Sequence, residues 1–176
     1  VEKKLIVGVV GLGVGEQHAL MYAELEQCRV KWLHDLSSKQ AKKVARQVGQ
    51  GEIATSLEQI LSDPDVSIVS LATFDHMHFG EVISAFDAGK HVFVEKPLCR
   101  SLEELNSIAQ SWNDNRRPHI QSNLVLREAP VYKQLKTMIE CGELGTIYAI
   151  DGDYLYGRLH KITEGWRDNV PDYSVM

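Results

Sequence analysis

Short apolar runs rich in β-branched residues alternate with helical patterns up to about residue 123. The runs at residues 5–10, 30–34, 67–72, 91–95 and 119–123 predict strands. The segments at residues 17–27, 38–48, 57–61, 78–88 and 102–113 predict helices. We expect Ser37 or Ser38 to cap the second helix, and Ser101 with Glu104 to form a capping box on the last. This repeated alternation predicts an α/β doubly wound fold, in which helices cover both faces of a parallel sheet.

A glycine-rich turn joins the first predicted strand to the first predicted helix. Gly11 permits a tight turn, and Gly13 lets the backbone approach a pyrophosphate at the positive end of the helix dipole. Glu16 occupies the place of the usual third glycine, and Gly15 lies one residue earlier. We expect Gly15 to make the close contact between helix and strand. The turn therefore predicts a dinucleotide-binding site.

Asp35 supports this prediction because it follows the second strand at the distance expected for an acid that binds the adenosine ribose. A carboxylate at this place repels a 2′-phosphate, so the sequence favours NAD over NADP. Two alternatives stay open. Asp35 could cap the helix at Ser38, and Lys39 could neutralise a phosphate.

Glu95, Lys96 and Pro97 follow the fourth long apolar run. Ligands of open parallel sheets bind beyond the carboxyl ends of the strands, where Lys96 would stand. Its ammonium group can hydrogen-bond a substrate oxygen and favour negative charge that develops there. Pro97 restricts the backbone of Lys96 and so helps to aim the amine.

The pattern changes after Asn123. A helix is predicted at residues 130–141, before Gly142, and a long strand with alternating character at residues 146–156. A single strand does not form a sheet. We therefore expect residues 1–123 to be a dinucleotide-binding Rossmann domain and residues 124–176 to be the incomplete beginning of an α+β substrate and oligomerisation domain.

Charge and cysteine content limit the partners and the compartment. The net charge of −5 and a pI near 5.8 provide no basic footprint for nucleic acid. The apolar run at residues 5–10 is far too short to span a membrane. Cys28, Cys99 and Cys141 are odd in number and far apart, which favours free thiols in a reducing cytoplasm.

In several segments the chain resembles the Gfo/Idh/MocA family of NAD(P)-dependent sugar and inositol dehydrogenases. The similar segments are residues 9–18, 73–78, 88–98, 127–130 and 142–147, and together they extend over nearly the whole chain. The block from Gly89 to Leu98 is the most specific of them.

The resemblance implies roles for single residues. Lys96 would be the catalytic lysine that contacts the reacting hydroxyl of a sugar, nucleotide-sugar or cyclitol. The implied cofactor-binding residues are Gly11, Gly13, Val14, Asp35, Thr73, His78, Glu95 and Asn123, and the implied substrate contacts besides Lys96 are Arg127, Trp166 and Arg167. Asp75 departs from the family, which often has Asn there. Since the family's catalytic Asp and His follow at positions beyond Met176, we expect the sequence to be a fragment that binds NAD without turnover.

The same residues are compatible with other functions. His76 and His78 beside Asp75 lack further ligands at a useful spacing, so no metal site is predicted. An NAD-dependent glycosidase that oxidises its substrate only transiently and a non-catalytic nucleotide-binding module remain alternatives to a dehydrogenase. Relatives use the second-domain sheet for subunit contact, so a homo-oligomer is expected.

Overall fold

The computed structural model describes residues 3–155, 157 and 164. It divides the chain into two units, Val1–Glu128 and Ala129–Met176. The strands of the first unit are β1 (Leu5–Val10), β2 (Cys28–His34), β3 (Glu52–Ile53), β4 (Ile68–Leu71), β5 (His91–Val94) and β6 (Ile120–Ser122). Its helices are α1 (Gly15–Glu24), α2 (Ser38–Val48), α3 (Leu57–Ser62), α4 (His78–Asp87), α5 (Leu102–Asp114) and the short 3-10 helix η1 (Val125–Glu128), while α6 (Pro130–Glu140) belongs to the second unit.

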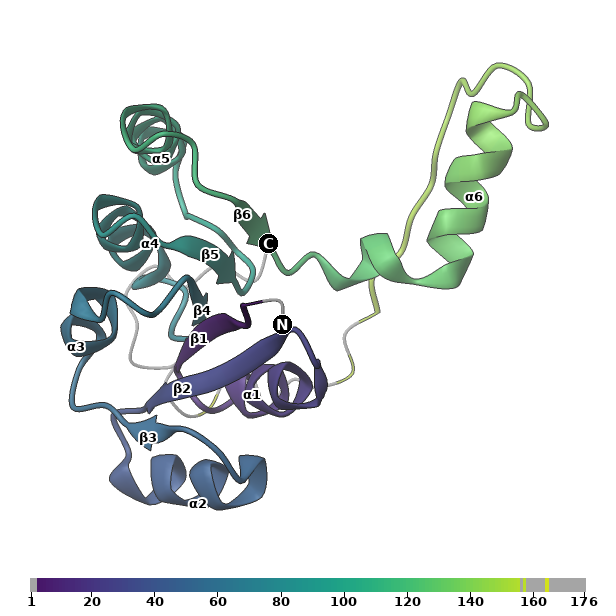
Figure 1. The fold of residues 1–176 in the computed structure, drawn as a ribbon. Helices are drawn as coiled ribbons and strands as arrows, with labels where there is room; N and C mark the ends of the chain where they lie inside the picture. The colour runs from purple at the N-terminus through teal and green to yellow at the C-terminus, as the bar shows by residue number, and fades with distance from the viewer. Residues whose placement is uncertain (1–2, 156, 158–163, 165–176) are drawn as a thin grey trace. The chain divides into compact units, whose positions relative to one another are not determined.

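The strands form one parallel sheet in the order β3-β2-β1-β4-β5-β6 (Figure 1), which confirms the predicted doubly wound fold. The chain leaves β1 toward β2 and later returns to place β4 on the other side of β1. In open α/β sheets, ligands bind where the strand order reverses in this way, which here is at the carboxyl ends of β1 and β4. In the register, Val10 pairs with both His34 and Leu71, and Val94 pairs with both Leu71 and Ser122. The strands thus end level with one another.

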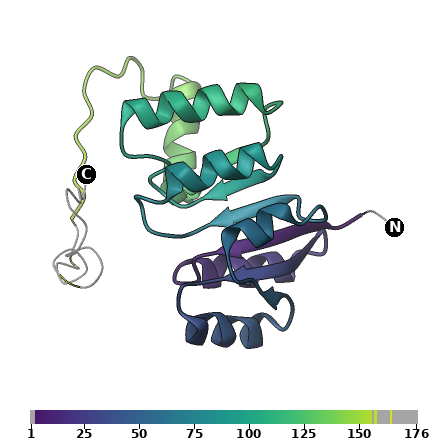
Figure 2. The ribbon, with the colours of Figure 1, turned by 90° about the vertical axis from the view of Figure 1, so that its left-hand side faces the viewer.

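Alternate side chains of the strands enter two separate cores. Val7 and Val9 of β1 pack with buried residues of α1 and α2, whereas Val10 packs with buried residues of α3, α4 and α5. Figure 2 looks onto the face that α4 and α5 cover. Gly8 lets α3 approach β1, because a Cβ atom at Gly8 would overlap the side chain of Ile60.

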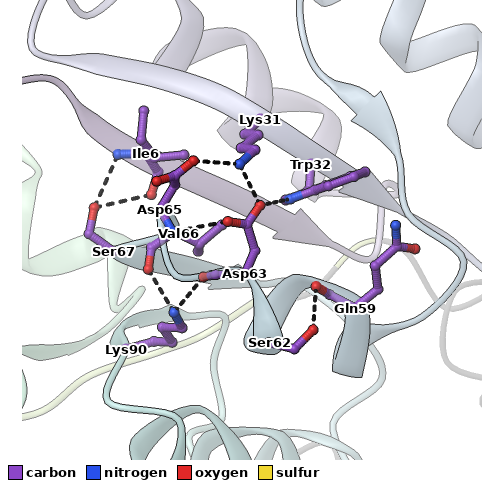
Figure 3. Close-up of polar contacts among 10 residues, drawn as sticks. All are labelled: Ile6, Lys31, Trp32, Gln59, Ser62, Asp63, Asp65, Val66, Ser67 and Lys90. Carbon is purple, nitrogen blue, oxygen red and sulfur yellow. Dashed lines mark hydrogen bonds and ion pairs between the residues drawn. The ribbon is translucent and has the colours of Figure 1, made fainter.

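A polar network holds the turn between α3 and β4 at the opposite, amino edge of the sheet (Figure 3). Asp63 accepts hydrogen bonds from the Trp32 indole at 2.6 Å and forms an ion pair with Lys31 at 2.7 Å. The buried ammonium group of Lys90 donates to the carbonyl oxygens of Asp63 and Val66 at 2.8 and 2.9 Å. The network joins β2, this turn and the start of β5, and it lies away from the carboxyl edge.

Two predictions about elements need correction, and one short strand was missed. Helix α1 covers residues 15–24 rather than 17–27, because the chain turns after Glu24 to begin β2 at Cys28. The two-residue strand β3 was not predicted, since so short a segment carries no periodicity. The strand predicted at residues 146–156 is wrong for residues 146–155, which form no strand, and residue 156 lies outside the described residues. These residues find no partner strand in the described part of the second unit, and most of their side chains are exposed, with Tyr148 97% exposed. Subunit contact through that sheet therefore stays a prediction.

Candidate functional site

The level strand ends line up the residues that follow them along the carboxyl edge of the sheet. In the spatial order of the strands, these residues are Asp35 after β2, Gly11 after β1, Thr73 near the end of β4, Glu95 after β5 and Asn123 after β6. Neighbouring strands lie about 4.8 Å apart, so the row from β2 to β5 spans roughly 14 Å. An extended ligand can contact all of these positions at once.

The glycine turn leaves the N-terminus of α1 open. Gly11 has φ +79°, and a Cβ atom there would overlap the Ala72 carbonyl oxygen, so only glycine fits. Gly13 is exposed, and a Cβ atom on it would meet nothing within 4 Å. Helices α2, α3 and α5 each begin with a capping serine, but Val14 provides no side-chain cap for α1. The first N–H groups of α1 therefore remain available to an anion, as a pyrophosphate requires.

Gly15, the displaced third glycine, makes the predicted close contact between helix and strand. A Cβ atom at Gly15 would lie 3.2 Å from the Ala72 Cβ and 3.3 Å from the Val9 Cγ1, so α1 contacts the sheet closely at this residue. Glu16 is held against α2, with hydrogen bonds from Lys43 at 2.8 Å and Gln47 at 3.1 Å. The hydrogen bond from Lys43 is the main cause that lowers the pKa of Glu16. Its negative charge is thus matched by a cation of α2.

Asp35 ties the second strand end to the glycine turn. Its Oδ2 accepts the Leu12 N–H and its Oδ1 accepts the Ser37 N–H, both at 2.7 Å. Ser37 itself caps α2 through the Gln40 N–H, so Asp35 is not merely the helix cap. Each carboxylate oxygen has two lone pairs, and each therefore keeps one acceptor site for a ligand diol.

Glu95 is the centre of a half-buried polar cluster at the β5 end of the row. Its Oε1 accepts hydrogen bonds from Asn123 Nδ2 at 2.6 Å and His18 Nε2 at 3.1 Å. Burial raises the pKa of Glu95, but the hydrogen bonds from His18 and Asn123 outweigh it and leave the pKa below its usual range. The cluster therefore keeps an ionised acceptor beside Lys96.

Lys96 is exposed, and its ammonium group has no hydrogen-bond or ion-pair partner within the described part of the chain. The loop that carries it is held from behind by α4, because His78 Nδ1 lies 2.7 Å from the Pro97 carbonyl oxygen. Lys96 is thus a free cation on a supported loop, which is what contact with a substrate oxygen needs.

Thr73 and His78 make side-chain contacts within the protein. The Thr73 hydroxyl donates to Glu81 at 2.5 Å, and burial raises the pKa of that carboxyl group. His78 is fully buried, and its Nε2 lies 3.3 Å from the Thr73 carbonyl oxygen. The His78 ring supports this loop from inside, and contact of the two residues with a cofactor stays a prediction.

Three predicted substrate contacts remain: one lies just after β6, and two lie outside the described residues. Arg127 is exposed in η1, just after β6. Trp166 and Arg167 lie outside the described residues. No group of three or more potential metal ligands occurs among residues 3–155, 157 and 164. Over the same residues, no helix is long and apolar enough to cross a membrane.

Two members of the site were not predicted as such. His18 and Ser70 link α1 to β4 and Glu95, with His18 Nδ1 3.0 Å from Ser70 Oγ. A sequence signal exists for Ser70, since it is a polar residue inside an apolar strand. His18 carries no comparable signal, because only the packing of α1 on the sheet brings it to Glu95.

Comparison with known proteins finds relatives over most of the chain. The model of the Gfo/Idh/MocA oxidoreductase family, described by its NAD-binding Rossmann fold, matches residues 5–120. Levoglucosan dehydrogenase of Pseudarthrobacter phenanthrenivorans is 31% identical over 162 residues, which are 87% of this chain and 41% of that protein.

Solved structures of other proteins have a similar fold. Levoglucosan dehydrogenase in complex with NADH and levoglucosan matches with a TM-score of 0.74 and 30% identity, over 82% of this chain and 41% of its own. The scyllo-inositol dehydrogenase of Lactobacillus casei, with bound NAD(H) and scyllo-inositol, shares the fold with a TM-score of 0.77 at 24% identity, over 82% of this chain and 43% of its own. The chain thus spans about two fifths of the length of these relatives.

Proposed function

Because the chain belongs to the Gfo/Idh/MocA oxidoreductase family with its NAD-binding Rossmann fold, we propose that it forms the cofactor-binding part of a dehydrogenase acting on a hydroxyl carbon of a sugar or cyclitol. The observation that carries the proposal is the row of groups along the carboxyl edge of the sheet. An acid, an open helix N-terminus and a carboxylate cluster follow one another there, each at the end of a neighbouring strand.

NAD fits this row in one direction. The adenosine ribose would lie at Asp35, whose two oxygens each keep an acceptor site for a hydroxyl group. The pyrophosphate would lie over Gly13 and the open N-terminus of α1. The nicotinamide nucleoside would then reach Glu95 and Asn123, which places its ring beside Lys96.

Bound NAD supplies the hydride acceptor in such a reaction. Lys96 would donate a hydrogen bond to the substrate hydroxyl oxygen and stabilise the negative charge that grows there as the proton leaves. Arg127, exposed after β6, would contact the same substrate. The proposed substrate class follows the relatives, which are named after levoglucosan and scyllo-inositol, both rings with several hydroxyl groups.

The preference for NAD over NADP rests on Asp35. A 2′-phosphate would meet a carboxylate that already accepts two backbone N–H groups and has no cation bound to it in the described part of the chain. The negative charges of the carboxylate and of a 2′-phosphate repel each other, so a phosphorylated ribose is disfavoured.

Calorimetric titration of the chain with NADH and NADPH tests the proposal. We expect NADH to bind and NADPH to bind at least tenfold more weakly, and Asp35→Ala to weaken NADH by about tenfold, since a hydrogen bond to a charged group contributes about 1.5–3 kcal/mol. Lys39→Ala, in the first turn of α2, is the matched control and should preserve the preference for NADH. Equal binding of NADH and NADPH by the native chain would contradict the assignment of Asp35.

Turnover distinguishes the candidate reactions. We expect residues 1–176 alone to bind NADH without oxidising polyols. In the whole protein, net nicotinamide reduction with a sugar or cyclitol supports a dehydrogenase, whereas substrate cleavage without net reduction would point to a glycosidase that oxidises transiently.

A further inference from the structure

A chain of hydrogen bonds runs from the interior of the sheet to the nicotinamide end of the site. Ser70 is fully buried in the middle of β4, and its hydroxyl group lies 3.0 Å from His18 Nδ1. His18 Nε2 in turn lies 3.1 Å from Glu95 Oε1. The side chains of His18 and Glu95 are only 9% and 14% exposed. Three elements, β4, α1 and the end of β5, are therefore joined by polar contacts that solvent barely reaches.

The chemistry of these groups fixes the direction of the bonds. An ionised carboxylate only accepts, so His18 must donate from Nε2 to Glu95. In the neutral ring Nδ1 is then the acceptor, and it receives the Ser70 hydroxyl proton. Glu95, which only accepts, thus selects the ring form with a proton on Nε2, and the Ser70 hydroxyl satisfies Nδ1 in that form. Phe93 holds the ring in place from β5 through an edge contact, with ring centroids 5.1 Å apart.

The two donors to Glu95 both end on the same oxygen. His18 and Asn123 occupy Oε1, which has two lone pairs and is therefore saturated. A ligand that donates to this carboxylate must use Oε2. The carboxylate is fixed from two sides, by α1 through His18 and by the end of β6 through Asn123.

We propose that His18, whose Nδ1 is satisfied by Ser70, is a positioning residue of the nicotinamide site, which aims Oε2 of Glu95 at an N–H or O–H donor of the nicotinamide nucleoside. The proposal rests on the proposed function, since it needs the nicotinamide end of NAD to lie at Glu95. It separates the two halves of the cofactor: His18 matters for the nicotinamide half and not for the adenosine half, which Asp35 and the α1 N-terminus hold.

The test compares two ligands on the same variants. Calorimetric titration with NADH and with ADP-ribose, which lacks the nicotinamide ring, is carried out on the native chain and on His18→Phe, His18→Gln and Ser70→Ala. We expect His18→Phe to weaken NADH by about tenfold and to change ADP-ribose by less than about twofold, because only one hydrogen bond to a charged group is lost. His18→Gln retains an amide donor near the place of Nε2 and should recover NADH affinity to within about threefold. Ser70→Ala should weaken NADH by a few-fold and leave ADP-ribose unchanged.

Met21→Ala, on the exposed side of the same helix, is the matched control and should bind both ligands like the native chain. Equal losses of NADH and ADP-ribose in His18→Phe, with no recovery in His18→Gln, would reduce His18 to a packing residue and overturn the proposal. Native NADH affinity in His18→Phe would overturn it as well. Absence of NADH binding by the native chain would instead contradict the proposed function.

A measurement without ligand covers the case in which His18→Phe does not fold. Nitrogen-15 spectra of the histidine rings in the native chain should show His18 with a proton on Nε2, and Ser70→Ala should reduce the population of this form. An Nδ1–H tautomer in the native chain would overturn the proposal, because that ring cannot donate to Glu95.

Discussion

Gly11 and Gly13 lie two residues apart in the same turn but have different roles. Gly11 has a positive φ and no room for a Cβ atom beside Ala72, so its lack of a side chain serves the fold. Gly13 has open space around it, so its lack of a side chain serves the approach of a ligand. A difference between stability and binding is expected at these two residues.

We predict that Gly11→Ala lowers the free energy of unfolding by about 2–4 kcal/mol, because it adds overlap to a strained backbone. Gly13→Ala should change the free energy of unfolding by less than about 1 kcal/mol and weaken NADH by about tenfold or more, since the new methyl group stands where the pyrophosphate would approach. Urea unfolding and NADH titration of both variants check this. The reverse pattern would contradict the two roles.

At the scale of elements, sequence periodicity and helix caps located most of the strands and helices closely. Leu5–Val10 and Ser38–Val48 have the predicted bounds, because an apolar run and a serine cap define them locally. At α5, Ser101 caps the helix as predicted by accepting the Glu104 N–H. The Glu104 carboxylate, however, accepts the Arg100 N–H and not the Ser101 N–H that a capping box uses. Residues 146–155 show what local pattern misses: alternation alone does not make a strand when no partner strand pairs with it.

The turn between α3 and β4 gives the fold a dependence on acid. Burial raises the pKa of Asp63, but the hydrogen bonds from Lys31 and Trp32 outweigh it and lower the pKa to about 2. A carboxyl group with a depressed folded pKa stabilises the fold above its unfolded pKa, near 3.9, and loses this contribution as the pH falls toward the folded value.

We predict that between pH 6 and pH 2 the free energy of unfolding falls by about 2 kcal/mol more in the native chain than in Asp63→Asn. Urea unfolding at the two pH values measures this difference. Asp65→Asn, at a side chain that is 68% exposed, is the matched control and should keep the native dependence. An identical pH dependence in Asp63→Asn and the native chain would show that the network does not titrate as described.

At the scale of the whole molecule, the site belongs to one unit. Gly13, Asp35, Glu95, Asn123 and His18 all lie within Val1–Glu128, and the contacts that hold them come from the same unit. The residue pattern predicted Gly13 and Asp35, and the family resemblance implied Glu95 and Asn123. All four follow strands of a parallel sheet, and level strand ends gather such residues. The sequence did not identify His18 as a member of the site, since that depends on how α1 packs across β4 and β5.

We predict that a chain of residues 1–128 unfolds cooperatively and binds NADH within about twofold of residues 1–176, because no residue proposed to hold NAD is removed. Thermal unfolding and calorimetry on the two chains check this. Loss of NADH binding by residues 1–128 would mean that the second unit contributes to the cofactor site.

The most direct test of the central claim, that NAD lies along the carboxyl edge of the sheet, is a map of backbone amide shifts. Proton–nitrogen spectra of the chain are recorded while NADH is added. The largest shifts should fall on Gly11, Gly13, Ser37, Lys96 and Asn123, at the ends of β1, β2, β5 and β6. Shifts concentrated on the turn at Asp63 and Val66, at the amino edge of the sheet, would contradict it, as would unchanged spectra at millimolar NADH.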